Sequence, residues 1–321
     1  MKTFALIITL VVLSCPTGWA QGPSVSGEVD LDFRNRTASN GHSYPEIYSA
    51  GVRAGVTLNA SLRGTVDAER RYNRNLIQEA ALETDAAGGR LRGGLIRVPF
   101  GIYDTRETYA SGLINYPIVR SGYDYNAVDW GAPGVVWIGG TPKLQLEAAA
   151  FDGVSSGDWN TRNYTGGAAA RLQTYSGDLI IGVSRWDGYL SMDDHFSGRE
   201  VVQMTGIDWR YTRPQLIVRG EYMKGIEGGD RMHGWYTDLY YRIPNYGKWT
   251  AVGRVEEFKP AVDENDGRQV TAGIRYVAGA GWNVSINWLC NNGRQFYHDS
   301  WMHHTRHGGD WYLQIYRTIG Y

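Results

Sequence analysis

Two stretches of the sequence have the residue types and spacing of catalytic or metal-binding motifs. Gly153–Gly157 reads GVSSG, the glycine–x–serine–x–glycine pattern of a nucleophile elbow. That pattern exposes its serine on a strand–turn–helix, and no helical periodicity follows it here. Asp263–Gly267 reads DENDG, which has the carboxylates of a calcium loop but lacks the later bidentate glutamate. We interpret both stretches as polar loops and expect no enzymatic activity.

Histidines gather near the end of the chain, where imidazole groups could bind a metal ion. One polar stretch contains four of the seven histidines, namely His298, His303, His304 and His307. Neutral imidazole is a good ligand for Zn²⁺ or Cu²⁺. No helix sets the spacing of these side chains, so we favour an exposed polar loop and keep the four histidines as weak metal candidates. We expect no cofactor.

Charged side chains form the largest group that could act together, through an electric field rather than a reaction. Arginines recur in the later part of the chain, at Arg171, Arg210, Arg219, Arg242, Arg254 and Arg275. The long stretch from Phe100 to Pro133 carries a second charged set, at Asp104, Arg106, Glu107, Arg120, Asp124 and Asp129. A basic wall facing an acidic loop would set a transverse field that orients solutes and water. Such a field requires elements that bring both sets to one cavity.

The elements that carry these charges are predicted strands with one apolar and one charged face. From Val25 to Phe33, alternate residues are apolar or glycine, and polar or charged residues lie between them. The same separation recurs in residues 62–71, 143–150 and 269–276. These segments approach the roughly 9–11 residues of a tilted membrane strand, whereas strands of soluble sheets have about 5–6 residues. The pattern therefore favours a membrane β-barrel over a soluble β-sandwich.

The number of segments predicts the architecture. About 16 strands can be placed between residues 25 and 321, which indicates an all-β, antiparallel transmembrane β-barrel. Tight turns such as DAAGG and YSGD alternate with connections that are mostly longer and polar. Outer-membrane barrels have such short turns on one rim and long loops on the other. A barrel of this size leaves an aqueous channel, and no linker divides the chain into further domains.

Residues 1–20 have the features of a secretory signal peptide. Lys2 precedes the apolar run FALIITLVVL, and small residues stand before a cleavage site after Ala20. An acylated Cys15 fits less well, because Pro16 follows it. Residues 21–321 then form the barrel domain with a single cysteine, Cys290, and no intramolecular disulfide. A net charge of −1 without a basic run excludes an obvious nucleic-acid partner.

The chain ends on a strand pattern whose last residue is aromatic. Apolar residues stand at alternate positions, interrupted by Arg317, at Trp311, Leu313, Ile315, Ile319 and Tyr321. This ending resembles the terminal strand of Gram-negative outer-membrane porins, which closes against the first strand and is read by the barrel-assembly machinery. Most of those proteins end in phenylalanine, so Tyr321 is a departure. The resemblance implies that these five residues are an assembly signal.

The long connection after the fifth predicted strand has the position of the porin loop that folds inward. The stretch GGLIRVPFGIYDTRE resembles the strand-and-loop segment of the phosphate-selective porin O/P superfamily, with Arg97, Pro99, Phe100 and Gly101 in matching places. The resemblance implies a pore constricted by the loop of residues 100–132. It does not imply phosphate selectivity, because the lysine and arginine clusters that select phosphate have no obvious counterpart in this loop.

Together these expectations indicate an outer-membrane porin, exported by its signal peptide, that forms a diffusion channel for small hydrophilic solutes or ions. Its expected partners are outer-membrane lipid, lipopolysaccharide and the assembly machinery, and the resemblance implies a homotrimer. In one alternative, the arginines pair with Asp208, Glu221, Asp238 and Glu256 and only keep the lumen wet. In another, a plugged barrel acts as an enzyme or a surface-binding protein. The solute and the charge preference stay open.

Overall fold

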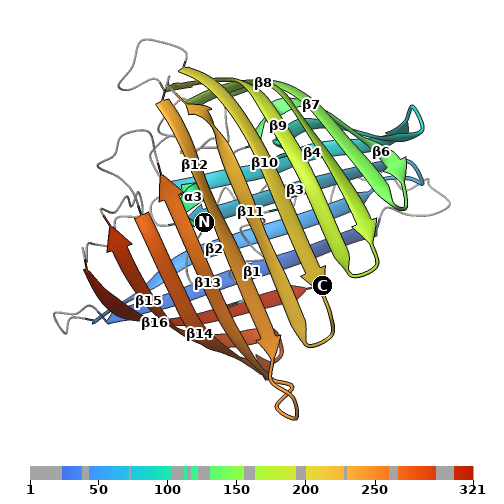
Figure 1. Ribbon diagram of the computed structural model, residues 1–321. Coiled ribbons are helices and arrows are strands. Elements are labelled where there is room, and N and C mark those ends of the chain that lie inside the picture. The colour runs from blue at the N-terminus through green and yellow to red at the C-terminus, as the bar shows by residue number, and fades with distance from the viewer. Residues whose placement is uncertain are drawn as a thin grey trace.

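The computed structural model describes residues 24–37, 43–71, 74–102, 112–113, 117–121, 131–154, 163–192, 200–227, 230–259, 267–293 and 307–320. Within these ranges, sixteen antiparallel strands form one closed barrel in which each strand pairs with its neighbours in sequence (Figure 1). The predicted all-β barrel and its strand number are confirmed.

The strands are long enough to cross a bilayer at a tilt. Their lengths run from 9 residues in β5 to 15 residues in β2, against the roughly 9–11 residues that a tilted strand needs. Their bounds are β1 (Ser24–Thr37), β2 (Ser43–Thr57), β3 (Leu62–Arg71), β4 (Arg74–Ala86), β5 (Gly89–Arg97), β6 (Gly131–Thr141), β7 (Leu144–Val154), β8 (Asn163–Ser176), β9 (Leu179–Met192), β10 (Glu200–Thr212), β11 (Leu216–Glu227), β12 (Asp230–Arg242), β13 (Trp249–Lys259), β14 (Gly267–Gly279), β15 (Trp282–Gly293) and β16 (His307–Gly320).

The first and last strands meet in the barrel wall. β16 pairs with β1 from Glu28 opposite Gly320 to Thr37 opposite Trp311. Every strand therefore has two partners, and the sheet has no open edge that could pair with another chain. The alternating pattern at the end of the sequence belongs to this closing strand.

The barrel wall is apolar on its outer face and polar on its inner face, because strand side chains alternate between the two faces. In β13, Arg254 and Glu256 are each 1% exposed, whereas Val255 between them is 47% exposed. Further exposed apolar side chains come from strands around the barrel, among them Leu82, Leu172, Val183, Ile207, Leu239 and Ile286. This inverted pattern suits a wall surrounded by lipid.

The two rims differ in their connections. Ala87–Gly88, Gly177–Asp178 and Ala280–Gly281 are two-residue turns, and each contains at least one residue with positive φ, as tight hairpins require. The opposite rim has most of the longer connections. Two connections on that rim are short, however, because only residues 72–73 separate β3 from β4 and only residues 228–229 separate β11 from β12.

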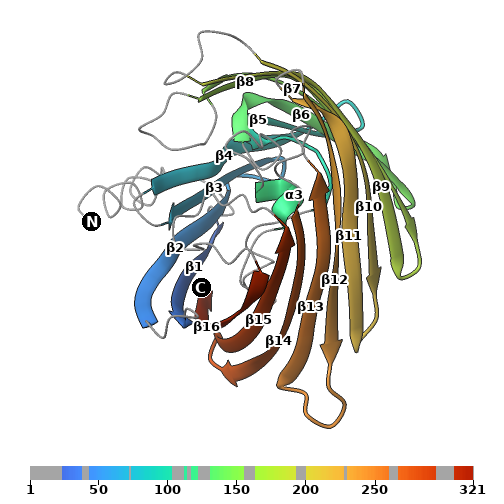
Figure 2. The ribbon, with the colours of Figure 1, turned by 60° about the vertical axis from the view of Figure 1, so that its left-hand side comes forward.

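The connection between β5 and β6 folds into the barrel, as predicted. Its described parts are residues 98–102, 112–113 and 117–121, and the last of these contains the short helix α3 (Ile118–Ser121). Figure 2 shows α3 inside the ring of strands. Leu113 and Val119 are both 0% exposed. No helix among the described residues is long and apolar enough to cross a membrane.

Candidate channel lining

Side chains of the inner wall hold the backbone of the inward loop by hydrogen bonds. Near the start of the loop, the Gly101 N–H donates to Ser184 Oγ at 3.0 Å, and the Ile102 N–H donates to a carboxylate oxygen of Glu221. At the first residue of α3, the Ile118 N–H donates to a carboxylate oxygen of Glu256. Between these points, Asn287 Nδ2 donates to the Gly112 carbonyl oxygen at 3.0 Å. The loop is therefore attached to the wall from β9 to β15.

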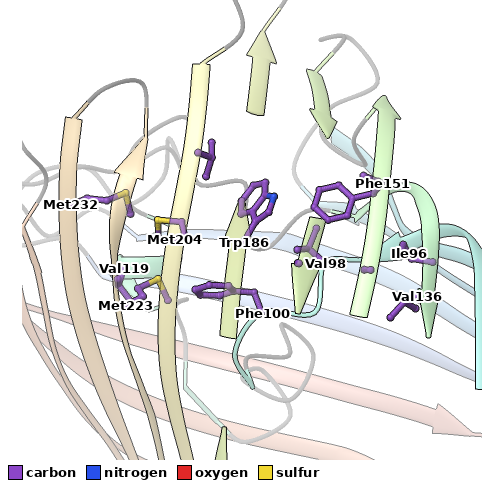
Figure 3. Packing of buried hydrophobic residues seen from close by; sticks show 14 of the residues in the cluster. Ile96, Val98, Phe100, Val119, Val136, Phe151, Trp186, Met204, Met223 and Met232 are labelled. Carbon is purple, nitrogen blue, oxygen red and sulfur yellow. The ribbon is translucent and has the colours of Figure 1, made fainter. Parts of the chain in front are cut away.

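Apolar side chains of the loop pack into a hydrophobic cluster that extends along the wall from β4 to β13 (Figure 3). Phe100 and Val119 belong to the loop, and the wall contributes side chains from β10, β11 and β12, among them Met204, Met223 and Met232. Met204 and Met223 are at most 1% exposed. The cluster explains why the described apolar side chains of the loop are buried inside a polar barrel.

Two glycines of the inner wall leave space for these loop side chains. A Cβ added at Gly206 in β10 would lie 2.9 Å from Cζ of Phe100. A Cβ added at Gly234 in β12 would lie 2.7 Å from Cγ2 of Val119. Contacts this short are not tolerated between carbon atoms, so the absence of a side chain at both positions lets the loop approach the wall.

Three of the arginines predicted to line the pore are buried in ion pairs. Arg254 Nε lies 2.6 Å and Arg219 Nε 3.1 Å from the carboxylate of Asp238, and the three side chains are at most 1% exposed. Arg171 Nη2 lies 2.8 Å from the carboxylate of Asp208. The pairing alternative is thereby confirmed at these two carboxylates. Glu221 and Glu256 accept hydrogen bonds from the loop backbone.

The other three predicted arginines of the pore wall have different surroundings. Arg242 is exposed and stands at the last position of β12. Arg210 in β10 is half-buried. Arg275 in β14 is half-buried and lies close to the inward loop, since a Cβ added at Gly112 would lie 2.9 Å from its Cβ. Among the six arginines, Arg242 is the most accessible.

A second group of arginines, which the sequence interpretation did not single out, lies on β2, β3 and β5. Arg92 bridges two carboxylates of β4, with Nη1 3.0 Å from Glu79 and Nη2 2.8 Å from Glu83. Arg90 and Arg63 also approach Glu83, at 3.1 Å and 3.8 Å. We call these side chains, together with Asp67, Arg53 and Arg97, the arginine cluster.

The remaining part of the arginine cluster is centred on Asp67 in β3. Its carboxylate lies 3.1 Å from Arg53 Nη2 and 3.3 Å from Arg97 Nη2. The cluster thus contains five arginines and three carboxylates, a net charge of 5 − 3 = +2. Its arginine side chains are 27–52% exposed, unlike those of the buried pairs on the other side of the barrel. In the sequence, the alternation of Arg90, Leu91 and Arg92 already indicated a strand with basic side chains on its inner face.

The described hydrogen bonds of the inward loop go to other strands than those of the arginine cluster. These hydrogen bonds attach the loop to β9, β11, β13 and β15, of which β11 and β13 lie across the ring from β3 and β5. A channel between the loop and β2–β5 would have a net positive side. The sequence alone identified the strands but not which of them the described parts of the loop contact.

The predicted charged residues of the loop lie outside the described side chains. Asp104, Arg106, Glu107, Asp124 and Asp129 fall between the described ranges, and only the backbone of Arg120 is described, in α3. Their predicted role stays a prediction.

The histidines predicted as weak metal candidates also lie outside the described side chains. His298, His303 and His304 lie outside the described residues, and of His307 only the backbone is described, at the start of β16. Within the described ranges, no group of three or more His, Cys, Asp or Glu residues is arranged to hold a metal ion.

The predicted assembly signal lies mostly in β16. Trp311 is 58% exposed on the outer face, and Leu313 and Ile315 are half-buried at alternate positions after it. Ile319 pairs with Val29 of β1, and Tyr321 lies outside the described residues.

No protein-family model and no curated protein matches the chain. Solved structures are similar to it in fold. OmpF of Salmonella typhi in complex with daunomycin has a TM-score of 0.67 at 13% identity, over 94% of this chain and 98% of that chain. The trimer form of OmpT from Vibrio cholerae has a TM-score of 0.64 at 12% identity, over 94% and 100%. The anion-selective porin from Comamonas acidovorans has a TM-score of 0.63 at 11% identity, over 94% and 99%. The chain is therefore a porin-like barrel in its fold.

Proposed function

We propose that the chain is an outer-membrane porin, a water-filled channel for the passive diffusion of small hydrophilic solutes or ions. The observation that carries this proposal is the inward loop, whose described parts are hydrogen-bonded to wall strands from β9 to β15. A barrel of about 16 strands encloses an aqueous space. A loop attached to one side of that space narrows it without filling it, so residues 100–132 form the constriction.

The two sides of the proposed constriction carry different charges. On the wall, the arginine cluster has a net charge of +2 in partly exposed side chains. On the loop, the sequence offers the carboxylates of Asp104, Glu107, Asp124 and Asp129 beside Arg106 and Arg120. Opposite charges across a narrow aqueous space set a transverse field. The proposal thus assigns the basic side to the arginine cluster.

The arginines of the later strands divide into two proposed roles. Arg210, Arg242 and Arg275 remain proposed pore-wall residues, because each is half-buried or exposed. Arg171, Arg219 and Arg254 stabilise the wall behind the loop through their carboxylate partners. The buried side chains of an ion pair are out of reach of a passing solute. Their role is structural, because removing one partner would leave the other charge uncompensated.

The location, assembly and family position belong to the same proposal. Export by residues 1–20 would bring residues 21–321 to the outer membrane, where the assembly machinery would read the end of β16. One similar structure is a trimer form, which supports a homotrimer. The matching positions of Arg97, Pro99, Phe100 and Gly101 support a relationship to the porin O/P superfamily. Outer-membrane lipid and lipopolysaccharide would surround the apolar face.

Liposome swelling tests the proposed channel. The mature chain, residues 21–321, is refolded into liposomes that are then diluted into isotonic solutions of neutral sugars of increasing size. The proposal predicts swelling that is fast with the smallest sugars and slower with each larger one. The control is the same protein added after heat denaturation. Absence of swelling with every sugar, although the barrel is folded, would contradict the proposal and favour a plugged barrel with an enzymatic or surface-binding role.

A further inference from the structure

An open cavity lies at the end of the barrel that carries the short turns. It measures about 660 Å³ and is lined by residues of β4–β7 and of the turn between β4 and β5. Cavities that hold small ligands usually measure about 300–1,000 Å³. The cavity therefore has room for a small solute. It also adjoins the arginine cluster, because Arg90 belongs to both.

The polar side chains of the cavity stand on the inner face of the wall. Asp85 in β4 and Arg90 in β5 are directly paired in the register, so they share a face and their Cβ atoms lie about 4.5–5.5 Å apart. Leu91, next to Arg90, is 38% exposed on the outer face, and side chains alternate along a strand. Gln145 belongs to the inner wall of β7, where its Nε2 donates to Glu147 at 2.8 Å. Solutes in the lumen can therefore reach these groups.

The cavity contains one charge of each sign. Asp85 and Arg90 are the only ionisable side chains among the described residues that line it, so its net charge is 1 − 1 = 0. The Asp85 carboxylate is exposed and has no hydrogen-bond or ion-pair partner among the described residues. It is thus a free acceptor at the wall of the lumen.

Arg90 keeps donors available for a second carboxylate. Its Nη1 lies 3.1 Å from Glu83, and its side chain is 42% exposed. Glu83 also lies 2.8 Å from Arg92, so one negative charge is shared between two cations. The Nε and Nη2 groups of Arg90 make no hydrogen bond to the described residues. A guanidinium with two such groups can bind a carboxylate through parallel N–H donors.

Two neutral side chains of the cavity are held in place and still have a hydrogen atom to donate. Gln145 Nε2 donates to Glu147, and its Oε1 accepts from the Tyr175 hydroxyl at 3.2 Å. These contacts fix the amide and leave the second N–H of Nε2 without a partner among the described residues. Thr141 Oγ1 accepts from two backbone N–H groups after it, at 3.2 Å and 3.3 Å, so its own hydroxyl hydrogen remains available. Both side chains are prepared to donate to an oxygen atom of a solute.

The charges of the cavity fit a zwitterion better than other small solutes. A simple anion would be repelled by Asp85, and a simple cation would be repelled by Arg90. A sugar would find no aromatic side chain to stack on among the described residues that line the cavity. A solute with one ammonium and one carboxylate group complements both charges.

We propose that this cavity is a binding subsite for small zwitterionic solutes, which have a free ammonium and a free carboxylate group as amino acids and short peptides do. Asp85 accepts hydrogen bonds from the ammonium group, Arg90 donates to the carboxylate, and Gln145 and Thr141 donate to the remaining oxygen atoms. The proposal rests on the channel proposed above and names a substrate class for it. Short turns of outer-membrane barrels face the periplasm, so an entering solute meets the subsite after the constriction.

Binding of dialanine to the refolded barrel in non-ionic detergent tests the subsite. The dissociation constant is measured by saturation-transfer nuclear magnetic resonance, which detects weak ligands. Asp85→Asn keeps the shape of the side chain and removes its charge. We expect about fivefold weaker binding in this variant, the effect of a partly exposed ion pair. The matched control, Asp178→Asn, removes a carboxylate that is 40% exposed in another turn of the same rim, outside the cavity, and should bind dialanine as the parent does.

Derivatives of dialanine test each charged contact. N-acetyl-dialanine has no ammonium group and should bind the parent as weakly as dialanine binds Asp85→Asn. That variant should not distinguish the two ligands. Dialanine amide has no carboxylate and should bind the parent about fivefold more weakly than dialanine, because it loses the contact with Arg90. Equal affinity of the parent for dialanine and either derivative, an unchanged affinity in Asp85→Asn, or an equal loss in the control would each overturn the proposal.

Two further measurements separate this subsite from the channel and from a general cavity for polar solutes. Sugar-driven swelling of liposomes that contain the parent measures the channel independently of dialanine. Binding without swelling would contradict the channel and leave the zwitterion site standing, whereas swelling without binding would overturn the site alone. Sucrose should not displace dialanine from the parent. Displacement by sucrose would show that the cavity does not select zwitterions, and the proposal would be wrong.

Discussion

Arg92 and Arg254 lie on opposite sides of the barrel, and the same side chain has a different use in each place. The side chain of Arg254 is 0% exposed, and its Nε lies 2.6 Å from the carboxylate of Asp238, so its charge is neutralised within the wall. Arg92 is 27% exposed and bridges two carboxylates in a cluster that keeps a net positive charge. In the proposed channel, a solute could interact with the second kind of arginine but not with the first. Burial, rather than residue type, therefore identifies the residues that can select ions.

Neutralising two arginines of the cluster should change the ion preference of the channel. Arg63 and Arg90 are the most exposed members, so Arg63→Gln with Arg90→Gln removes the net +2 charge with the least disturbance of the wall. A unit charge about 7 Å from an ion contributes roughly 0.6 kcal/mol in water, or about threefold in permeability. We expect the reversal potential in a KCl gradient to shift toward cation preference by at least that ratio. Arg231→Gln with Arg268→Gln on the outer face removes the same charge and should cause no shift; equal shifts in both variants would refute the assignment.

The inward loop and the wall glycines that it packs against, Gly206 and Gly234, show what the sequence could predict about the elements. Alternation of apolar and charged residues predicted the strands, and the length and position of the loop after β5 predicted its inward fold. The contact between Phe100 and Gly206 could not be predicted, because it joins residues 106 positions apart through the closed ring. The attachment of the described loop segments to β9, β11, β13 and β15 escaped prediction for the same reason, since it depends on which strands the loop reaches. The buried pairs of Asp238 and Asp208 likewise follow from register and burial.

A larger side chain at Gly206, where the loop residue Phe100 packs, should destabilise the attachment of the loop to the wall. Gly206→Val introduces carbon atoms where Phe100 already packs, and overpacking of this kind costs about 1–3 kcal/mol. We expect a lower thermal midpoint and a noisier open-channel current, because the loop is displaced from the wall. The control is Gly253→Val, at a wall position where an added Cβ finds its nearest neighbour at 3.5 Å. If both variants behave alike, the absence of a side chain at position 206 is not needed for the loop to pack against the wall.

At the scale of the whole molecule, stability comes from closure of the ring. β16 pairs with β1 over ten residues of each strand, from Glu28 opposite Gly320 to Thr37 opposite Trp311, and this pairing closes the ring. An all-antiparallel closed ring leaves no strand of the described barrel with an unpaired edge, which a lipid-surrounded sheet requires. Strands that pair only with sequence neighbours make the seam the one long-range pairing of the ring.

Deleting Tyr321 tests the seam as an assembly signal. We expect less folded, heat-modifiable barrel in the outer membrane while the exported precursor still reaches the periplasm, because the end of β16 would be recognised less well. The measurement is the folded fraction on unheated gels of membrane extracts. Substitution by phenylalanine, Tyr321→Phe, keeps the aromatic ring and should restore the yield. A folded yield that the deletion leaves unchanged would show that Tyr321 is not part of the signal.

Single-channel conductance in planar bilayers tests the central claim, that the loop of residues 100–132 narrows an open channel. The variant lacks Ala110–Gly122, which removes α3 and its contact with Glu256. The control lacks residues 194–198 from the connection between β9 and β10, a deletion on the same rim outside the inward loop. With both variants shown to be folded by heat-modifiability, we predict a higher conductance for the first and a conductance equal to the parent for the second. A conductance that stays at the parental value after removal of Ala110–Gly122 would contradict the account.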